Sequence, residues 1–314
     1  MTTVPAVAAS NPPSAGGALV LTVSSNKGGV GKTTVASNLA IYFRALREDL
    51  PVLLVGLDDQ HTIDRMFALR APRPGDGNLK HAFAERSFDR VAQLGQYGIH
   101  FVPSPPDLIG LKARAEDIGT LRRIVNRTVR DGVVIFDTKS DLEALTQNAL
   151  VAADRVMIPV ADWASLEEAV KIFAFLERVR PGQRKARVLL TLADLRTRIE
   201  GPGHDLRTLL ETEVRSRGWP LYRSMLSRSP RVEALNSATG RPLSILHHAA
   251  GTPIHRQLKD LAEEVLADLG FGAEAGSVLP PALKRRMVTT RAPEAESASD
   301  WKDLFMRSLR RVQR

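Results

Sequence analysis

Short apolar runs alternate with amphipathic segments along most of the chain. The apolar runs are short enough for buried strands and cover residues 18–23, 52–57, 98–103, 132–136, 155–160 and 186–192. Segments with helical periodicity occupy residues 35–46, 116–130, 142–152, 165–179, 206–217 and 253–269. Strands that alternate with helices predict an α/β fold, in which a mostly parallel, twisted β-sheet carries helices on both faces.

Composition divides the chain into four parts. Residues 1–17 are rich in Ala, Pro, Ser and Gly and lack the basic start of a signal peptide, so we expect a disordered N-terminal arm. Residues 18–270 hold the alternating pattern and are expected to form the main domain. Residues 271–299 have the composition of a flexible linker. Residues 300–314 predict a basic amphipathic C-terminal helix with Trp301, Leu304 and Phe305 on its apolar face.

Charge and residue usage narrow the classes of partner and of chemistry. The chain of 314 residues has a formal net charge of +9 and a pI of about 10.1, which favours a polyanion such as nucleic acid or an anionic membrane surface. It has no cysteine, which excludes disulfides, thiol catalysis and cysteine-bound zinc. No apolar run approaches the roughly 20 residues that span a bilayer.

A glycine-rich segment, Ser24 to Thr34, lies between the first predicted strand and the first predicted helix. In this arrangement successive backbone N–H groups and the helix N-terminus form an anion-binding nest. Lys32 can reach the β- and γ-phosphates of a nucleotide, and the Thr33 hydroxyl can coordinate Mg²⁺. The segment therefore predicts a triphosphate site.

Two further strands end in carboxylates, as a nucleoside triphosphatase requires. The strand Val133 to Phe136 runs into Asp137, which is expected to hold Mg²⁺ through water. The strand Leu53 to Leu57 runs into Asp58, which is expected to orient the attacking water.

The loop Lys-Gly-Gly-Val-Gly-Lys-Thr-Thr, with its additional lysine at Lys27, resembles the deviant Walker A loop of the ParA/MinD family of P-loop ATPases. The downstream segments 188–198 and 226–242 look more like the ParA (Soj-like) partition ATPases than like MinD. Asn26 stands where the strict phosphate-loop pattern has a glycine. Four positions depart from the family pattern: Gly56 replaces the first aspartate of the switch segment, Asp59 replaces its proline, and Lys139 and Ser140 replace two prolines after Asp137.

The resemblance implies a mechanism in which ATP closes a face-to-face homodimer and Lys27 reaches the phosphates bound by the partner. Lys27, Lys32 and Asp58 would then be catalytic, and Thr33, Asp58 and Asp137 would hold Mg²⁺. The ATP-binding residues would be Lys27, Gly28, Gly29, Val30, Gly31, Lys32, Thr33 and Thr34. Arg196, Arg228 and Arg231 match positions that bind nonspecific DNA. The resemblance also implies a ParB-like or cargo-adaptor protein that stimulates hydrolysis, a cargo such as a plasmid or chromosome, and a cytoplasmic, nucleoid-associated protein.

Other functions stay open at this point. The C-terminal helix at residues 300–314 fits a membrane anchor, which would make the chain a MinD-like positioning ATPase, but it fits a partner-docking helix or a DNA-binding arm as well. The substitutions at Gly56 and Lys139 leave room for a binding module that hydrolyses ATP poorly. His61, next to the switch segment, could sense the nucleotide state, but a surface histidine is the favoured interpretation.

Overall fold

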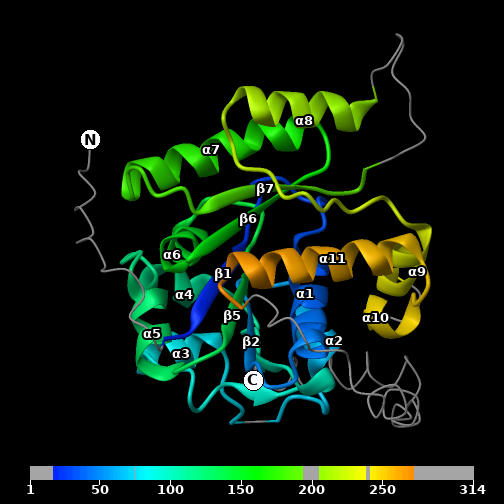
Figure 1. Cartoon of the computed structure of the whole chain (residues 1–314). Helices are drawn as coiled ribbons and strands as arrows, with labels where there is room; N and C mark the ends of the chain where they lie inside the picture. Colours follow the sequence, from blue (N-terminus) through cyan, green and yellow to red (C-terminus); the bar gives the residue numbers. More distant parts are fainter. Residues whose placement is uncertain (1–16, 74, 194–204, 238–240, 272–314) are drawn as a thin grey trace.

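The computed structural model describes residues 17–73, 75–193, 205–237 and 241–271, which form a three-layered α/β domain (Figure 1). Its sheet has the strand order β3-β4-β2-β5-β1-β6-β7, and every neighbouring pair is parallel except β3 with β4. The strands are β1 (Leu19–Val23), β2 (Val52–Gly56), β3 (Gln93–Leu94), β4 (His100–Val102), β5 (Val133–Asp137), β6 (Arg155–Val160) and β7 (Ala186–Leu190).

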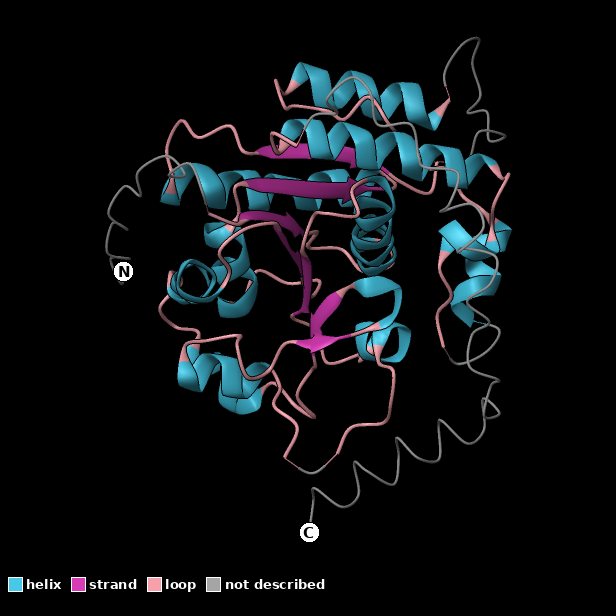
Figure 2. Cartoon of the chain, turned by 60° about the horizontal axis from the view of Figure 1, so that its bottom comes forward, coloured by secondary structure: helices cyan, strands magenta, loops and turns pink. Residues whose placement is uncertain are grey.

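Helices cover both faces of this sheet (Figure 2). One face carries α3 (Leu79–Glu85), α4 (Ile109–Arg114), α5 (Thr120–Thr128), α6 (Ala144–Ala152), α7 (Trp163–Val179) and α8 (Leu206–Ser216). The other face carries α1 (Lys32–Leu46), α2 (Thr62–Phe67), α9 (Pro230–Ser237), α10 (Ile245–His248) and α11 (Pro253–Asp268).

The two-residue period of the strands divides the buried side chains into two cores. Along β5, Val134 and Phe136 pack against α5 and α6, whereas Val133 and Ile135 pack on the face of α1 and α11. All four side chains are fully buried. The central strands are therefore apolar on both faces, which is why they appear in the sequence as uninterrupted hydrophobic runs.

The predicted fold class is confirmed, and each predicted strand and helix within the described residues has a counterpart within a few residues. The pattern missed α2, α3, α4, α9, α10 and β3, because elements this short offer too few positions to show a period. Residues 1–16 and 272–314 lie outside the described residues, and with them the proposed arm except Gly17, the linker except Phe271, and the whole C-terminal helix. Within the described residues, no helix has the length and apolar character needed to cross a membrane.

Candidate nucleotide-binding site

The topology brings the candidate residues to one edge of the sheet. In the register, Val23 at the end of β1 and Gly56 at the end of β2 both pair with Asp137 at the end of β5. The glycine-rich loop after β1, the switch segment after β2 and Asp137 therefore meet at the carboxyl ends of adjacent parallel strands. This edge is where open α/β sheets bind their ligands.

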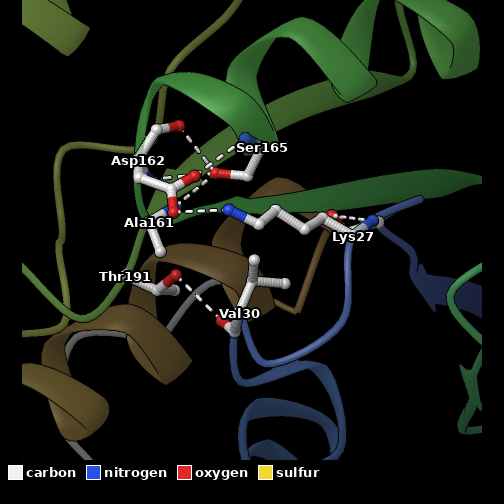
Figure 3. A network of polar contacts seen from close by, with 7 residues as sticks. Lys27, Val30, Ala161, Asp162, Ser165 and Thr191 are labelled. Carbon is white, nitrogen blue, oxygen red and sulfur yellow. Dashed lines mark hydrogen bonds and ion pairs between the residues drawn. The ribbon is translucent and has the colours of Figure 1, made fainter.

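The conformation of the loop depends on its glycines and on a fixed centre. Gly29 and Gly31 have φ values of +77° and +89°, a region that other residues rarely adopt. Between them Val30 is buried, and its carbonyl accepts a 2.9 Å hydrogen bond from the Thr191 hydroxyl after β7 (Figure 3). α1 begins at Lys32, directly after Gly31, so the N-terminus of the helix faces the loop.

Lys32 is folded inward across the loop. It is only 7% exposed, and its Nζ donates to the Ser140 hydroxyl at 2.6 Å and to the Lys27 carbonyl at 3.0 Å. Burial lowers the pKa of Lys32, while the nearby carboxylates of Asp137 and Asp58 act in the opposite direction. A buried ammonium held by two neutral oxygens is placed to gain from an anionic ligand.

Asp137 lies beneath the loop and is fully buried. The side chain of Thr33 donates a hydrogen bond to the carboxylate, but Asp137 Oδ1 has no hydrogen-bond partner among the described residues. Burial raises the pKa of Asp137 to about 7, despite the opposing effects of Thr33 and Lys32. A buried carboxylate oxygen without a partner is costly, which indicates that something absent from the free chain binds there.

The donor set fits magnesium. Asp58, Thr33 and Asp137 line one small cavity, and burial raises the pKa of Asp58. The described residues contain no cluster of three or more His, Cys, Asp or Glu side chains that would enclose a metal. Mg²⁺ is usually held by one or two carboxylates and completes its shell with water and substrate phosphate, so these oxygens suffice.

The departures from the family pattern contact one another or neighbouring residues of the site. Lys139 Nζ lies 3.3 Å from a carboxylate oxygen of Asp59, so the added positive and negative charges pair. A Cβ placed on Gly56 would lie 3.0 Å from Ile63 Cδ1 of α2, so the space of the missing aspartate is partly filled by an apolar side chain. The fourth departure, Ser140, is the acceptor for Lys32.

Lys27 points away from the loop toward α7 (Figure 3). Its Nζ lies 2.6 Å from Asp162 Oδ2, in an ion pair whose side chains are 34% and 45% exposed. Asp162 is the N-cap of α7, because its Oδ1 accepts from Ser165 N at 2.8 Å and Ser165 Oγ accepts from Asp162 N. Burial alone would raise the pKa of Asp162, but the hydrogen bonds from Lys27 and Ser165 hold it below its ordinary value.

Asp162 is a residue that the sequence reasoning missed. The available signal was the capping box, an aspartate followed three residues later by serine at the start of a helical segment. That signal predicts the start of α7 but not the partner of the carboxylate, since Lys27 lies far away in the sequence.

His61 was also misjudged as a surface residue: its side chain is 14% exposed and contacts Asp64 at 3.0 Å.

Two of the candidate DNA-binding arginines, Arg228 and Arg231, lie among the described residues and are held by local contacts. Arg228 pairs with Glu233 at 2.9 Å in an exposed ion pair, and Arg231 on α9 donates two hydrogen bonds to the carbonyl of His248. Arg196 lies outside the described residues. One contact links α9 to the glycine-rich loop, because Asn236 Nδ2 donates to Thr34 Oγ1 at 3.3 Å.

Comparisons with known proteins identify relatives of this chain. The family model described as "AAA domain" matches residues 18–186. The chain is similar to the chromosome-partitioning ATPase Soj of Thermus thermophilus, with 32% identity over 79% of this chain and 95% of that protein. It is also similar to the chromosome partitioning protein ParA of Caulobacter vibrioides, with 28% identity over 79% of this chain and 94% of that protein.

Among solved structures, a putative plasmid partition protein of Borrelia burgdorferi bound to AMPPNP has the same fold. Its TM-score is 0.62 at 17% identity, over 80% of this chain and 99% of that one.

Proposed function

The chain belongs to the ParA-type family of P-loop ATPases, and from that premise we propose that it is a Mg²⁺-dependent ATPase that dimerises on ATP and binds DNA without sequence preference to position a cargo. The observation that supports this proposal most is the buried carboxylate of Asp137, with one oxygen lacking a partner, beside Lys32 and Thr33. A metal ion bound there would give that oxygen a partner.

Different residues would serve nucleotide binding and hydrolysis. The backbone of residues 28–34 would cradle the phosphates, with Lys32 leaving Ser140 to contact the β- and γ-phosphates. Thr33, Asp58 and Asp137 would hold Mg²⁺, which when bound neutralises charge on the phosphate oxygens. Asp58 would also orient the attacking water, for which its position beside the cavity is suited.

Lys27 would connect nucleotide state to dimerisation. In the single chain its charge is neutralised by Asp162. On dimerisation it would exchange that carboxylate for the triphosphate bound by the partner subunit. Because the new contact exists only when two chains and ATP are together, ATP binding and dimer formation become one coupled equilibrium.

DNA would be held by phosphate contacts from Arg196, Arg228 and Arg231, since cationic side chains give a salt-dependent affinity without sequence preference. The contact of Asn236 with Thr34 offers a route from the nucleotide loop to α9, which carries Arg231. A ParB-like or cargo-adaptor protein would stimulate hydrolysis and release the dimer, and the protein would be cytoplasmic and associated with the nucleoid.

One observation favours a second candidate, a nucleotide-dependent binding module that hydrolyses ATP poorly. At Gly56 the switch segment lacks the first family carboxylate, and Ile63 partly fills the space of that side chain. The carboxylate of Asp59 is paired with Lys139. Slow hydrolysis would still permit ATP-dependent dimerisation, because the phosphate-binding residues are separate from the switch segment.

ATP binding and ATP turnover, each measured with and without DNA, test the main proposal. Wild type is expected to bind and turn over ATP, Lys32→Ala to lose binding, and Asp58→Ala to bind ATP without turnover. Binding without turnover in wild type would favour the second candidate. Failure of wild type to bind ATP, or an undiminished Lys32→Ala variant, would overturn both.

Co-sedimentation tests the membrane alternative. The full chain and a chain lacking residues 300–314 are each mixed with anionic vesicles and with DNA. The main proposal predicts DNA binding by the full chain. Strong vesicle binding that depends on residues 300–314, together with no DNA binding, would instead support a MinD-like membrane function.

A further inference from the structure

A second cavity lies at the opposite edge of the sheet from the glycine-rich loop. Its volume is roughly 470 Å³, within the range of small-molecule sites. Leu19 at the start of β1 and Arg155 at the start of β6 line it, and Lys185 lines it directly before β7. Since the phosphate-binding loop follows the carboxyl end of β1, the two sites are separated by the length of the strands.

Among the described residues that line the cavity, cationic side chains outnumber carboxylates. The cations are Arg122, Arg155, Arg180, Arg184 and Lys185, and the carboxylates are Asp154 and Asp268. Both carboxylates are already engaged by arginines. Arg122 donates to Asp154 Oδ2 at 2.9 Å, which also accepts from Val20 N, while Arg155 and Arg187 both contact Asp268.

Lys185 adds a buried positive charge to this lining, and burying that charge costs free energy. It is 7% exposed, and its Nζ donates to the carbonyls of Leu150 and Ala153 at the end of α6, at 2.8 and 3.0 Å. No carboxylate of the described residues forms an ion pair with it. Burial, reinforced by Arg180 and Arg122, lowers the pKa of Lys185 to about 7.

Capping the end of α6 explains only part of this arrangement. Lys185 uses two of its three N–H donors on carbonyls, and Arg122 donates to a third carbonyl, that of Ala152 at 3.0 Å. Neutral donors could cap the helix without the cost of burying charge. Capping also leaves unexplained why Arg184 lies at the same cavity.

We propose that this cavity is a second ligand site, which binds a small, multiply charged anion of the phosphate or polyphosphate class through Arg180, Arg184 and Lys185. Guanidinium groups match the geometry of phosphate oxygens and can bind them in bidentate fashion. The volume admits more than a single phosphate ion. An anion here would supply a counter-charge to Lys185, with which no carboxylate of the described residues forms an ion pair.

Calorimetric titration of the full chain with pyrophosphate tests this proposal. The chain is first saturated with Mg²⁺ and ADP, so that ADP occupies the glycine-rich loop and pyrophosphate cannot bind there. Wild type is expected to bind one pyrophosphate more tightly than citrate. Arg184→Glu is expected to weaken binding about tenfold or more, because it replaces an attraction by a repulsion. Arg215→Glu on exposed α8, outside the cavity, has the same charge change and is expected to have no effect.

Proton uptake gives a second readout. Arg180, Asp154 and Arg122 act electrostatically on Lys185, and Arg155, Arg184 and Asp268 line the same cavity. An anion stabilises the Lys185 ammonium, so binding at pH 8 should take up a proton, seen as different heats in buffers of different ionisation enthalpy. Lys185→Met should abolish that uptake, with folding checked by circular dichroism.

Three results would overturn the proposal. They are no pyrophosphate binding by the ADP-saturated chain, equal binding by wild type and Arg184→Glu, or equal losses in Arg184→Glu and Arg215→Glu. Should Lys185→Met fail to fold, the Arg184→Glu and Arg215→Glu comparison still decides the matter. Binding that persists in Lys32→Ala would confirm that the site is separate from the nucleotide loop.

Discussion

Removing the charge of Asp162 should make the ATP-dependent dimer tighter. Asp162→Asn abolishes the ion pair with Lys27 but keeps an oxygen to cap Ser165 N, and asparagine caps helices as well as aspartate does. The helix should therefore stay intact. Lys27 would then no longer have to leave a carboxylate before it reaches the partner's triphosphate.

The magnitude follows from the exposure of the pair. With side chains 34% and 45% exposed, the pair is solvent-screened and worth about 0.2–1 kcal/mol despite its 2.6 Å distance. A dimer would break two such pairs, so its dissociation constant should fall by a factor of about 2 to 30. The gain should shrink as salt is raised, because exposed charges are screened.

Analytical ultracentrifugation with the ATP analogue AMPPNP measures this dissociation constant. Glu167→Gln is the matched control, because it removes another surface ion pair of α7, that with Arg217 at 2.6 Å, without touching Lys27. An unchanged or weaker dimer in Asp162→Asn, or an equal gain in Glu167→Gln, would refute the reasoning.

Three further predictions concern stability. Gly56→Asp should lower the free energy of unfolding, measured by urea denaturation, by about 1–3 kcal/mol. Adding Ile63→Val, which removes the crowding Cδ1, should recover part of that loss. Full stability of the single variant would contradict the packing. Because the pKa of Lys185 is lowered to about 7, the unfolded chain binds more protons above that pH. The free energy of unfolding should therefore rise between pH 7 and 9, and a rise that persists in Lys185→Met would exclude this cause. Arg231→Ala should lower the free energy of unfolding, measured by thermal denaturation, by about 0.5–1.5 kcal/mol, because its hydrogen bonds to the His248 carbonyl are lost. An unchanged free energy of unfolding would show that those bonds are not formed in solution.

The sequence was most informative where functional residues lie together in one short segment. The glycine-rich loop and the two strand-ending aspartates occupy short segments whose order along the chain already implies adjacent parallel strands. The positions of Lys32, Asp58 and Asp137 could thus be anticipated, and the sheet register explains their meeting.

Contacts between distant segments could not be anticipated. Nothing near Lys27 indicates that Asp162 faces it, and nothing near Asp59 indicates Lys139, because such pairs are set by how β6 and β5 lie in the sheet. The cavity around Lys185 was not predicted for a related reason. Arg180, Arg184 and Lys185 share one short segment between α7 and β7, but nothing in that segment indicates that Arg122 and Arg155 line the same cavity.

The central claim, that Lys27 acts on the nucleotide of the other subunit, is tested most directly by mixing two inactive variants. In a mixed dimer of Lys27→Ala and Asp58→Ala, the site on the Lys27→Ala chain keeps its own Asp58 and receives Lys27 from its partner. Random pairing should then restore about one quarter of the wild-type ATPase rate, since half of the dimers are mixed and each holds one complete site. A mixture no more active than the two variants measured separately would contradict the claim.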